Sequence, residues 1–125
     1  MPRFAILDHT GAPDDPAGRH YDLLLEAGDA CRTWRLAELP VPGGPPVPAD
    51  ELPPHRLAWL DHVAGEVSGG RGFARRIDGG SYAPTQSISR EDSPAETIDV
   101  MLERNNTTSR LSLTASGNRW IARLL

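Results

Sequence analysis

The residues best suited to chemistry are histidines and aspartates near the N-terminus. The segment GRHYDLLLE, residues 18–26, has the composition of a β-strand, in which successive side chains point to opposite faces. One face is then apolar, whereas the other places His20 and Asp22 roughly 6.6 Å apart along the backbone. An imidazole and a carboxylate this close can both reach one metal ion or one phosphate. The apolar face consists of Tyr21, Leu23 and Leu25, and the polar one of His20, Asp22, Leu24 and Glu26.

All four histidines lie in the first half of the chain, and they could extend this site. His9 ends the first expected strand, whereas His55 and His62 are expected to begin and end one later strand. Their odd separation would put those two on opposite faces, so at most one of them faces a given site. Two histidines with one carboxylate suit manganese, iron or zinc. Histidines at strand ends are also common without any function, and spacing alone leaves both interpretations open.

Composition limits the possible functions. The chain has 125 residues, 38% hydrophobic and 24% charged, as expected for one globular domain. No apolar run approaches a membrane span, the N-terminus lacks a signal-peptide pattern, and Cys31 has no partner for a disulfide, so we expect a cytoplasmic protein. The 13 basic residues are all arginine, which excludes a lysine nucleophile. A net charge of −4 argues against strong non-specific binding to DNA.

The pattern of short apolar runs and turn residues predicts an all-β fold: a small closed or nearly closed barrel of about eight strands, with short helical turns in loops. The proline-rich segment 39–54 and the segment 84–96 are expected to be exposed connections, the first with one helical turn at PADEL. Hairpin turns are expected at ERNNTTSR and ASGNRW. The expected strands are residues 3–9, 20–28, 31–39, 55–63, 70–78, 97–104, 109–115 and 119–125.

Several weaker signals have ordinary structural explanations. The glycine-rich segment 65–72 lacks the ending of a phosphate-binding P-loop and is better explained as a hairpin turn. Arg71, Arg75 and Arg76 form a basic cluster that a solvated strand face explains as well as a nucleic-acid contact does. Cys31 lies in a strand-like context and is expected to be buried rather than reactive.

One longer segment resembles a known family. HYDLLLEAGDACRTWRL, residues 20–36, resembles the 3′-phosphoesterase domain attached to bacterial DNA ligase D and its small free-standing relatives. The shared pattern is His-aromatic-Asp, a hydrophobic pair, Leu-Glu, a short turn and a strand with Trp. The resemblance covers most of the chain, except residues 39–54 and 84–96. Weaker matches are RFAILDH, HRLAWLD, SGGRG, DGGSYAP and GNRWIARLL.

The resemblance implies that residues 1–125 form a single 3′-phosphoesterase-like barrel, a manganese-dependent hydrolase that removes 3′-phosphates or 3′-ribonucleotides in DNA repair. It implies DNA or RNA/DNA 3′ ends and other end-joining repair proteins as partners, and no membrane. By this likeness His9, His20 and Asp22 hold the manganese, or another divalent metal. A further histidine contacts the phosphate. His55 keeps the family's downstream distances and is preferred, although His62 follows an aspartate as the family's histidine does.

The chain also departs from the family pattern. Leu24 stands where ligase-linked members carry a phosphate-binding arginine, Glu38 replaces an expected basic residue, and Trp59 replaces a site tyrosine. The loop between His9 and His20 is longer than in those members. Charge-assisted contacts are worth about 1.5–3 kcal/mol each, so losing two cations should weaken phosphate binding. The remaining candidates for contacting phosphate or nucleic acid are Arg19, Arg71, Arg75, Arg76 and His62.

Three functions therefore stay open. The first is the metal-dependent phosphoesterase. The second is a catalytically weakened or inactive member that binds nucleic-acid ends or a repair protein. The third is an iron oxygenase with two histidines and one carboxylate as ligands. Manganese with phosphate release would support the first, absence of metal the second, and iron with oxygen-dependent turnover the third.

Overall fold

Nine antiparallel strands and one short 3₁₀ helix make up the described part of the computed structural model, which covers residues 2–84, 96–117 and 119–125. None of the described helical segments is long or apolar enough to cross a membrane. The elements are β1 (Arg3–Thr10), β2 (Arg19–Ala27), β3 (Ala30–Leu36), β4 (Val47–Arg56), η1 (Leu57–Asp61), β5 (Ala64–Glu66), β6 (Phe73–Pro84), β7 (Thr97–Glu103), β8 (Thr108–Ser116) and β9 (Arg119–Leu124).

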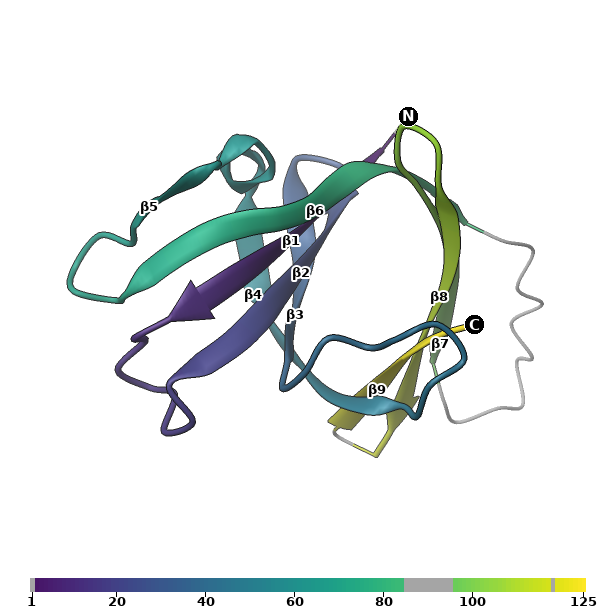
Figure 1. Cartoon of the computed structure of the whole chain (residues 1–125), viewed down its shortest axis with the longest axis horizontal. Helices are drawn as coiled ribbons and strands as arrows, with labels where there is room; N and C mark the ends of the chain where they lie inside the picture. The colour runs from purple at the N-terminus through teal and green to yellow at the C-terminus, as the bar shows by residue number, and fades with distance from the viewer. Residues whose placement is uncertain (1, 85–95, 118) are drawn as a thin grey trace.

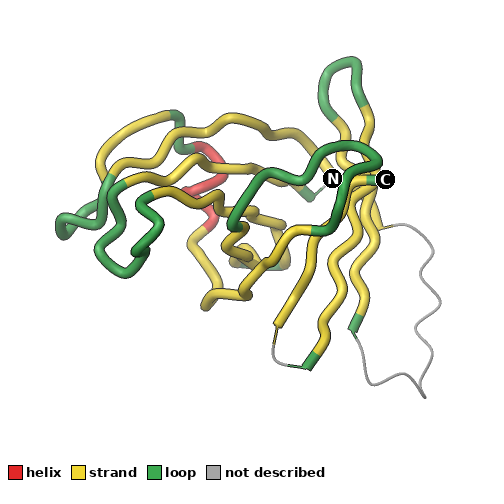
Figure 2. The backbone as a smooth tube through the Cα atoms, turned by 60° about the horizontal axis from the view of Figure 1, so that its bottom comes forward, coloured by secondary structure: helices red, strands yellow, loops and turns green. Residues whose placement is uncertain are grey.

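Eight of these strands close into a barrel. Their order is β1-β2-β3-β4-β9-β8-β7-β6, and a direct pairing of β1 with β6 completes the ring. The three-residue β5 adds to the outside edge of β6, at the left of Figure 1. Figure 2 shows how little of the chain is helical. The expectation of an all-β barrel of about eight strands is confirmed.

The main hydrophobic core fills the barrel and follows from strand alternation. Leu23 and Leu25 point inward from β2, and Trp34 from β3 meets Trp120 from β9 edge-on at 5.5 Å between ring centroids. Tyr21 packs against the margin of this core. Of the apolar face expected in residues 18–26, Leu23 and Leu25 are confirmed as core and Tyr21 is partly buried. The buried set is Phe4, Ile6, Leu23, Leu25, Trp34, Leu36, Val47, Ala49, Val100, Leu102, Leu111, Leu113, Trp120 and Ala122.

A second, smaller apolar layer covers the outer face of β1, β2 and β3. Leu24 and Cys31 lie in it, both fully buried, together with Ala5, Leu7 and Leu60. Leu60 belongs to η1, a short 3₁₀ helix that packs over this face. This layer confirms that Cys31 is buried. On the same outer face of β2, His20 and Asp22 are also buried.

Two sequence expectations were wrong, and both concern the connection after β3. Residues 55–63 are not one strand: His55 and Arg56 end β4, and Leu57–Asp61 turn as η1, which packs on the second apolar layer. Residues 39–54 are not wholly a connection, since β4 begins at Val47 and includes the PADEL segment expected to be helical. The two prolines at 53 and 54 fit within β4 because they fall where its register against β3 shifts, and a bulge does not need their missing N–H groups.

The hairpin between β7 and β8 is confirmed, with Arg104 N–H donating to the Thr107 carbonyl at 2.9 Å. The β8–β9 pairing likewise confirms the second expected hairpin. Of the connection expected at 84–96, residues 85–95 lie outside the described residues.

Candidate metal centre

Strand pairing brings His9, His20 and Asp22 together. His9 of β1 lies directly opposite His20 of β2 in the antiparallel register, and Asp22 follows two positions later on the same face. One donor atom from each of the three residues lies within 4.8 Å of the other two. The outer face of these two strands therefore carries a compact set of two imidazoles and one carboxylate.

Asp22 lies between the two imidazoles. Its Oδ2 is 3.2 Å from His9 Nδ1, and its Oδ1 is 3.3 Å from His20 Nε2. The two rings meet edge-on with centroids 4.7 Å apart. All three side chains are well shielded, with exposed fractions of 12% for His9, 2% for His20 and 8% for Asp22.

The outward-facing nitrogens of both histidines are held by acceptors. His9 Nε2 is 2.7 Å from the Arg71 carbonyl oxygen, and His20 Nδ1 is 2.9 Å from Asp15 Oδ2. A carbonyl or a carboxylate can only accept, so each of these nitrogens must carry the proton and donate. When an imidazole is neutral, its inward nitrogen, His9 Nδ1 or His20 Nε2, then carries a lone pair that faces Asp22; when His9 is protonated, its Nδ1 donates to Asp22 Oδ2.

The centre of the cluster has unmet polar groups. His20 Nε2 and Asp22 Oδ1 are buried and make no hydrogen bond to any described residue, since their 3.3 Å approach lacks hydrogen-bond alignment. Buried polar atoms without partners are costly, and lone pairs that face each other repel unless a cation or proton lies between them. Two imidazole nitrogens with one carboxylate oxygen suit manganese, iron or zinc, so these residues fit a divalent metal.

The electrostatics of the cluster agree with this. Burial works to raise the pKa of Asp22, but the nearby imidazoles of His20 and His9 outweigh it and hold that pKa below its usual range. Burial works to lower the pKa of His20, yet the nearby carboxylates of Asp22 and Asp15 outweigh it and raise that pKa. The cluster thus keeps its carboxylate ionised and attracts positive charge.

Two loops supply the outer hydrogen bonds. In the connection of residues 11–18, the Asp15 carboxylate also accepts from Ala17 N–H at 3.1 Å, which fixes it toward His20. In the connection of residues 67–72, Gly72 has φ +95° and lies so close to β1 that a Cβ would be 2.1 Å from the Thr10 carbonyl oxygen. Only glycine allows this approach, and it brings the Arg71 carbonyl to His9.

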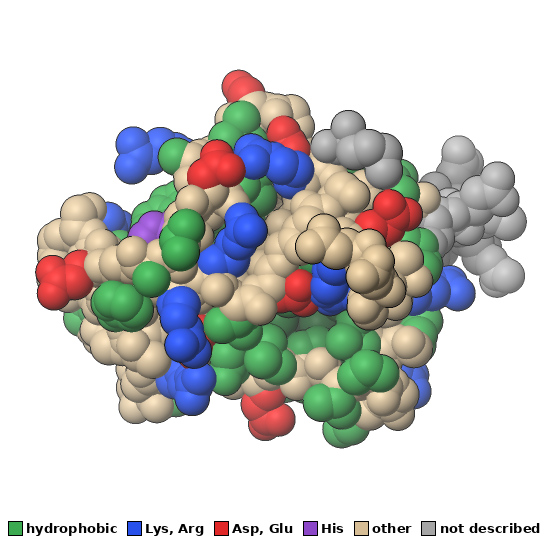
Figure 3. Space-filling model, turned by 45° about the horizontal axis from the view of Figure 1, so that its top comes forward, with side chains coloured by type: hydrophobic (Ala, Val, Ile, Leu, Met, Phe, Trp, Pro, Cys, Tyr) green, Lys and Arg blue, Asp and Glu red, His purple; other side chains and the backbone are tan. Residues whose placement is uncertain are grey.

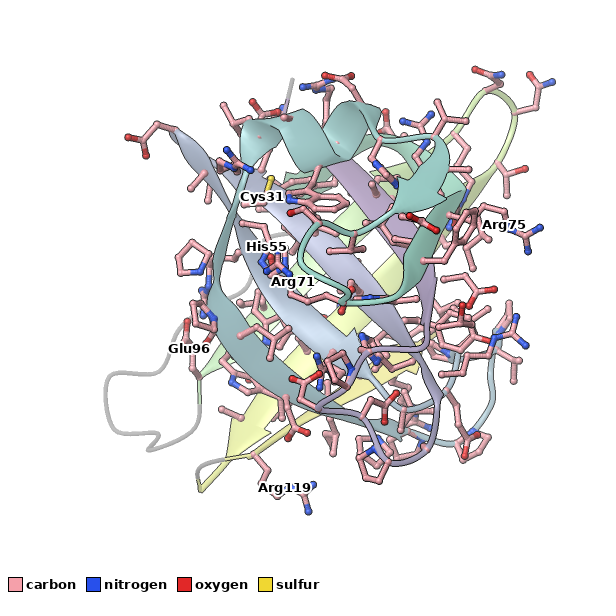
Figure 4. All side chains as sticks on the ribbon, turned by 90° about the vertical axis from the view of Figure 1, so that its left-hand side faces the viewer. Cys31, His55, Arg71, Arg75, Glu96 and Arg119 are labelled. Atoms are coloured by element: carbon pink, nitrogen blue, oxygen red, sulfur yellow. The ribbon has the colours of Figure 1, made fainter. Side chains whose placement is uncertain are left out.

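A cavity of about 610 Å³ opens beside the cluster. His9 and Asp22 lie in its wall, and β4, η1 and the loop after β5 surround it, as Figure 4 shows around His55 and Arg71. Its charged lining has a small excess of positive charge, with Arg35, Arg56 and Arg71 against Asp14 and Asp22, and Arg35 pairs with Asp14 at 3.3 Å. An anionic group could therefore enter and reach the cluster.

The structure separates the two histidines that competed for the phosphate position. His55, at the end of β4, lines the cavity with its Nδ1 donating to the Pro53 carbonyl at 3.1 Å. His62, after η1, packs on Trp59 and donates from Nε2 to the Ala74 carbonyl at 2.9 Å. The cavity lining thus includes His55 and not His62.

Of the four arginines singled out in the sequence, only Arg71 lines this cavity. Arg19 makes a two-pronged pair with Asp8, at 2.9 and 2.6 Å. Arg75 points away into solvent with a 60% exposed side chain, as seen at the right of Figure 4. Arg76 donates to the Leu60 carbonyl on the far side of η1.

The departures from the family pattern have different structural settings. Leu24 is completely buried in the second apolar layer, so its side chain packs against Leu60 rather than lining the cavity. Glu38 is exposed just after β3. Neither position offers a cation to the cavity.

Sequence reasoning missed Asp15, Arg35 and Arg56. Asp15 lies in the longer loop between His9 and His20, and the aspartate pair in that loop was the available signal. Arg35 could have been found by alternation, because it pairs with Asp22 across β2 and β3 and so shares its face. Arg56 could not, because it was expected near the start of a strand over residues 55–63, whereas it is the last residue of β4.

No protein-family model matches the chain, and no curated protein sequence matches it. The fold and the cluster geometry are therefore the observations on which a function can be argued.

Proposed function

We propose that this protein is a metal-dependent phosphoesterase that acts on DNA 3′ ends and removes a 3′-phosphate or a 3′-ribonucleotide. The observation that carries the proposal is the inward orientation of the donors of His9, His20 and Asp22, beside a cavity lined with arginines. The resemblance of residues 20–36 to 3′-phosphoesterase domains supports the choice of substrate.

His9 Nδ1, His20 Nε2 and an Asp22 oxygen would hold the metal, with manganese the preferred ion. A divalent metal in such a site supplies Lewis-acid stabilisation of charge on phosphoryl oxygens or lowers the pKa of a bound water. The Arg71 carbonyl orients the His9 imidazole and the Asp15 carboxylate orients that of His20, because each accepts a hydrogen bond from the outer ring nitrogen.

The cavity arginines would bind the phosphate. Arg71 is held in place by its Nε, which donates to the Ser68 carbonyl at 2.7 Å, and by Nη2, which bonds Ser68 Oγ at 3.1 Å. These bonds use two of five N–H donors, and the others remain to contact phosphate oxygens. On the face shown in Figure 3, basic and acidic side chains are interspersed. The cations that line the cavity are Arg35, Arg56 and Arg71.

His55 is suited to proton transfer. Its Nδ1–H donates to the Pro53 carbonyl, which leaves Nε2 as the nitrogen that can exchange a proton in the cavity. When protonated, His55 Nε2 would donate its proton to the leaving 3′ oxygen as a water oxygen bonds to phosphorus and the ester bond breaks, and the attacking water would release its own proton to solvent. The imidazole would then regain its proton from solvent.

A second candidate function is binding without catalysis. Its support is that Leu24 is sealed in the second apolar layer and Glu38 is exposed, so neither contributes the cation that the related domains have. The donor set also matches that of iron oxygenases with two histidines and one carboxylate.

The test is release of phosphate from a 3′-phosphorylated DNA oligonucleotide by metal-free protein supplied with manganese, iron or zinc. We expect manganese-dependent release, its loss in His20→Ala and Asp22→Asn, and a reduction in Arg71→Ala. Arg75→Ala is the control, because that arginine points away from the cavity. Metal binding without release from any 3′-phosphate or 3′-ribonucleotide end would favour the binding function, and oxygen-dependent turnover with iron would favour the oxygenase.

A further inference from the structure

Trp59 differs from the other two tryptophans in its setting. Trp34 and Trp120 are buried at 0% and 8% exposure inside the barrel. Trp59, in η1, is only partly buried, and it lines the cavity beside the His9–Asp22 cluster. A large aromatic ring left partly exposed in a cavity wall has apolar area available for a ligand.

The ring packs against the second apolar layer, and two imidazoles lie near it, with that of His55 edge-on at 6.5 Å between ring centroids. The imidazole of His62 packs on it with ring centroids 4.7 Å apart, and His62 is itself fixed by its hydrogen bond to the Ala74 carbonyl. His62 N–H also donates to the Trp59 carbonyl at 3.3 Å, which closes η1. Trp59 therefore offers a fixed surface, and binding to it costs little side-chain entropy.

The cavity suits a nucleotide in size and charge. Its volume of about 610 Å³ lies within the range of small-molecule sites, and it brings Trp59 together with Arg56 and Arg71. Apolar side chains of Leu52 and Val67 complete the lining near these polar groups. An aromatic surface beside cations is the arrangement by which proteins hold a base and its backbone phosphate in single-stranded nucleic acid.

We propose that the indole of Trp59 stacks on the terminal base of a single-stranded DNA 3′ end while its phosphate reaches the His9–His20–Asp22 cluster. This rests on the proposed function and narrows its substrate to ends whose last base is unpaired. The ring lies in a hollow whose walls include residues of β4, η1 and the loop of residues 67–72, and an aromatic surface beside cations in such a groove is the arrangement that binds single-stranded nucleic acid. Stacking needs only a π-face, so all four terminal bases are accepted.

The test compares two single-stranded oligonucleotides that end in a 3′-phosphate, one with a normal terminal thymine and one with an abasic terminal sugar. Protein with Asp22→Asn is titrated alongside the wild type, so that binding is measured without turnover. We expect the thymine oligonucleotide to quench the fluorescence of Trp59 and to bind about 5- to 150-fold more tightly than the abasic one. Trp59→Leu should remove this difference, and Trp59→Phe should keep part of it.

The outcomes separate the two proposals. Equal binding of both oligonucleotides by wild-type protein that releases phosphate would overturn stacking and leave the phosphoesterase in place. Binding of neither oligonucleotide would overturn both. The comparison in wild-type protein needs no variant, so it decides the question even if Trp59→Leu fails to fold.

Discussion

Replacing Asp15 tests the orientation of the metal ligands without touching any of them. Asp15 Oδ2 accepts from His20 Nδ1 at 2.9 Å, and the His20 side chain is only 2% exposed, with Asp15 at 10%. Asp15→Ala removes the acceptor that keeps the proton on Nδ1, so the imidazole can reprotonate on Nε2 or rotate. Either change withdraws the lone pair that faces Asp22.

Loss of such an outer partner typically weakens metal affinity 10- to 100-fold. The shielding of this hydrogen bond from water places the expected loss in the upper part of that range. Asp15→Asn should lose less than tenfold, because an amide oxygen still accepts from Nδ1 although the charge is gone.

The measurement is calorimetric titration of metal-free protein with manganese and with zinc. The control is Asp14→Ala, because Asp14 is the adjacent residue, is 71% exposed, and contacts Arg35 at 3.3 Å rather than a histidine. We expect that control to change affinity no more than about twofold, as suits an exposed ion pair. The reasoning is refuted if Asp15→Ala binds metal as tightly as the wild type while Asp22→Asn has lost binding.

Three further predictions concern the surroundings of the site. Leu24→Arg should lower the free energy of unfolding by about 3–5 kcal/mol, because it places an unpaired charge in a sealed apolar layer; a urea midpoint equal to that of the wild type would contradict this. Gly72→Ala should destabilise the fold and weaken metal binding together, since its Cβ would lie 2.1 Å from the Thr10 carbonyl oxygen; calorimetry that shows unchanged metal affinity would contradict it. Burial raises the pKa of Cys31, so its thiol stays protonated near neutral pH and should react with a disulfide reagent only on unfolding; rapid labelling of native protein at pH 7 would show that the second apolar layer opens.

Alternation of side chains made much of this molecule predictable from sequence. It places Leu23 and Leu25 in the barrel core and puts His20 beside Asp22 on the opposite face. It could not show that this opposite face is also buried, because Leu24 meets Leu60 from a helix far along the chain. An outer face covered by a distant segment looks the same in sequence as one exposed to water.

The errors after β3 have a local cause. Prolines normally argue against a strand, yet Pro53 and Pro54 occupy a bulge of β4 opposite β3, where they lose no ladder hydrogen bond. Leu57, Trp59 and Leu60, which follow, form a short apolar run that fits either a strand or one helical turn. They form η1 because the helical turn packs them on the second apolar layer. The ligand cluster was predictable because it depends on β1 and β2, whereas the cavity depends on these misassigned segments.

The described lining of the cavity and the ligand cluster all come from residues 7–74, whereas β7, β8 and β9 contribute only to the barrel wall and its core. The last three strands are thus separate from the candidate site. Substitutions in β7, β8 and β9 can therefore change the stability of the protein without changing what it binds. Residues of the cavity lining can likewise diverge toward new substrates while the pairing of β1 with β6 that closes the barrel stays intact.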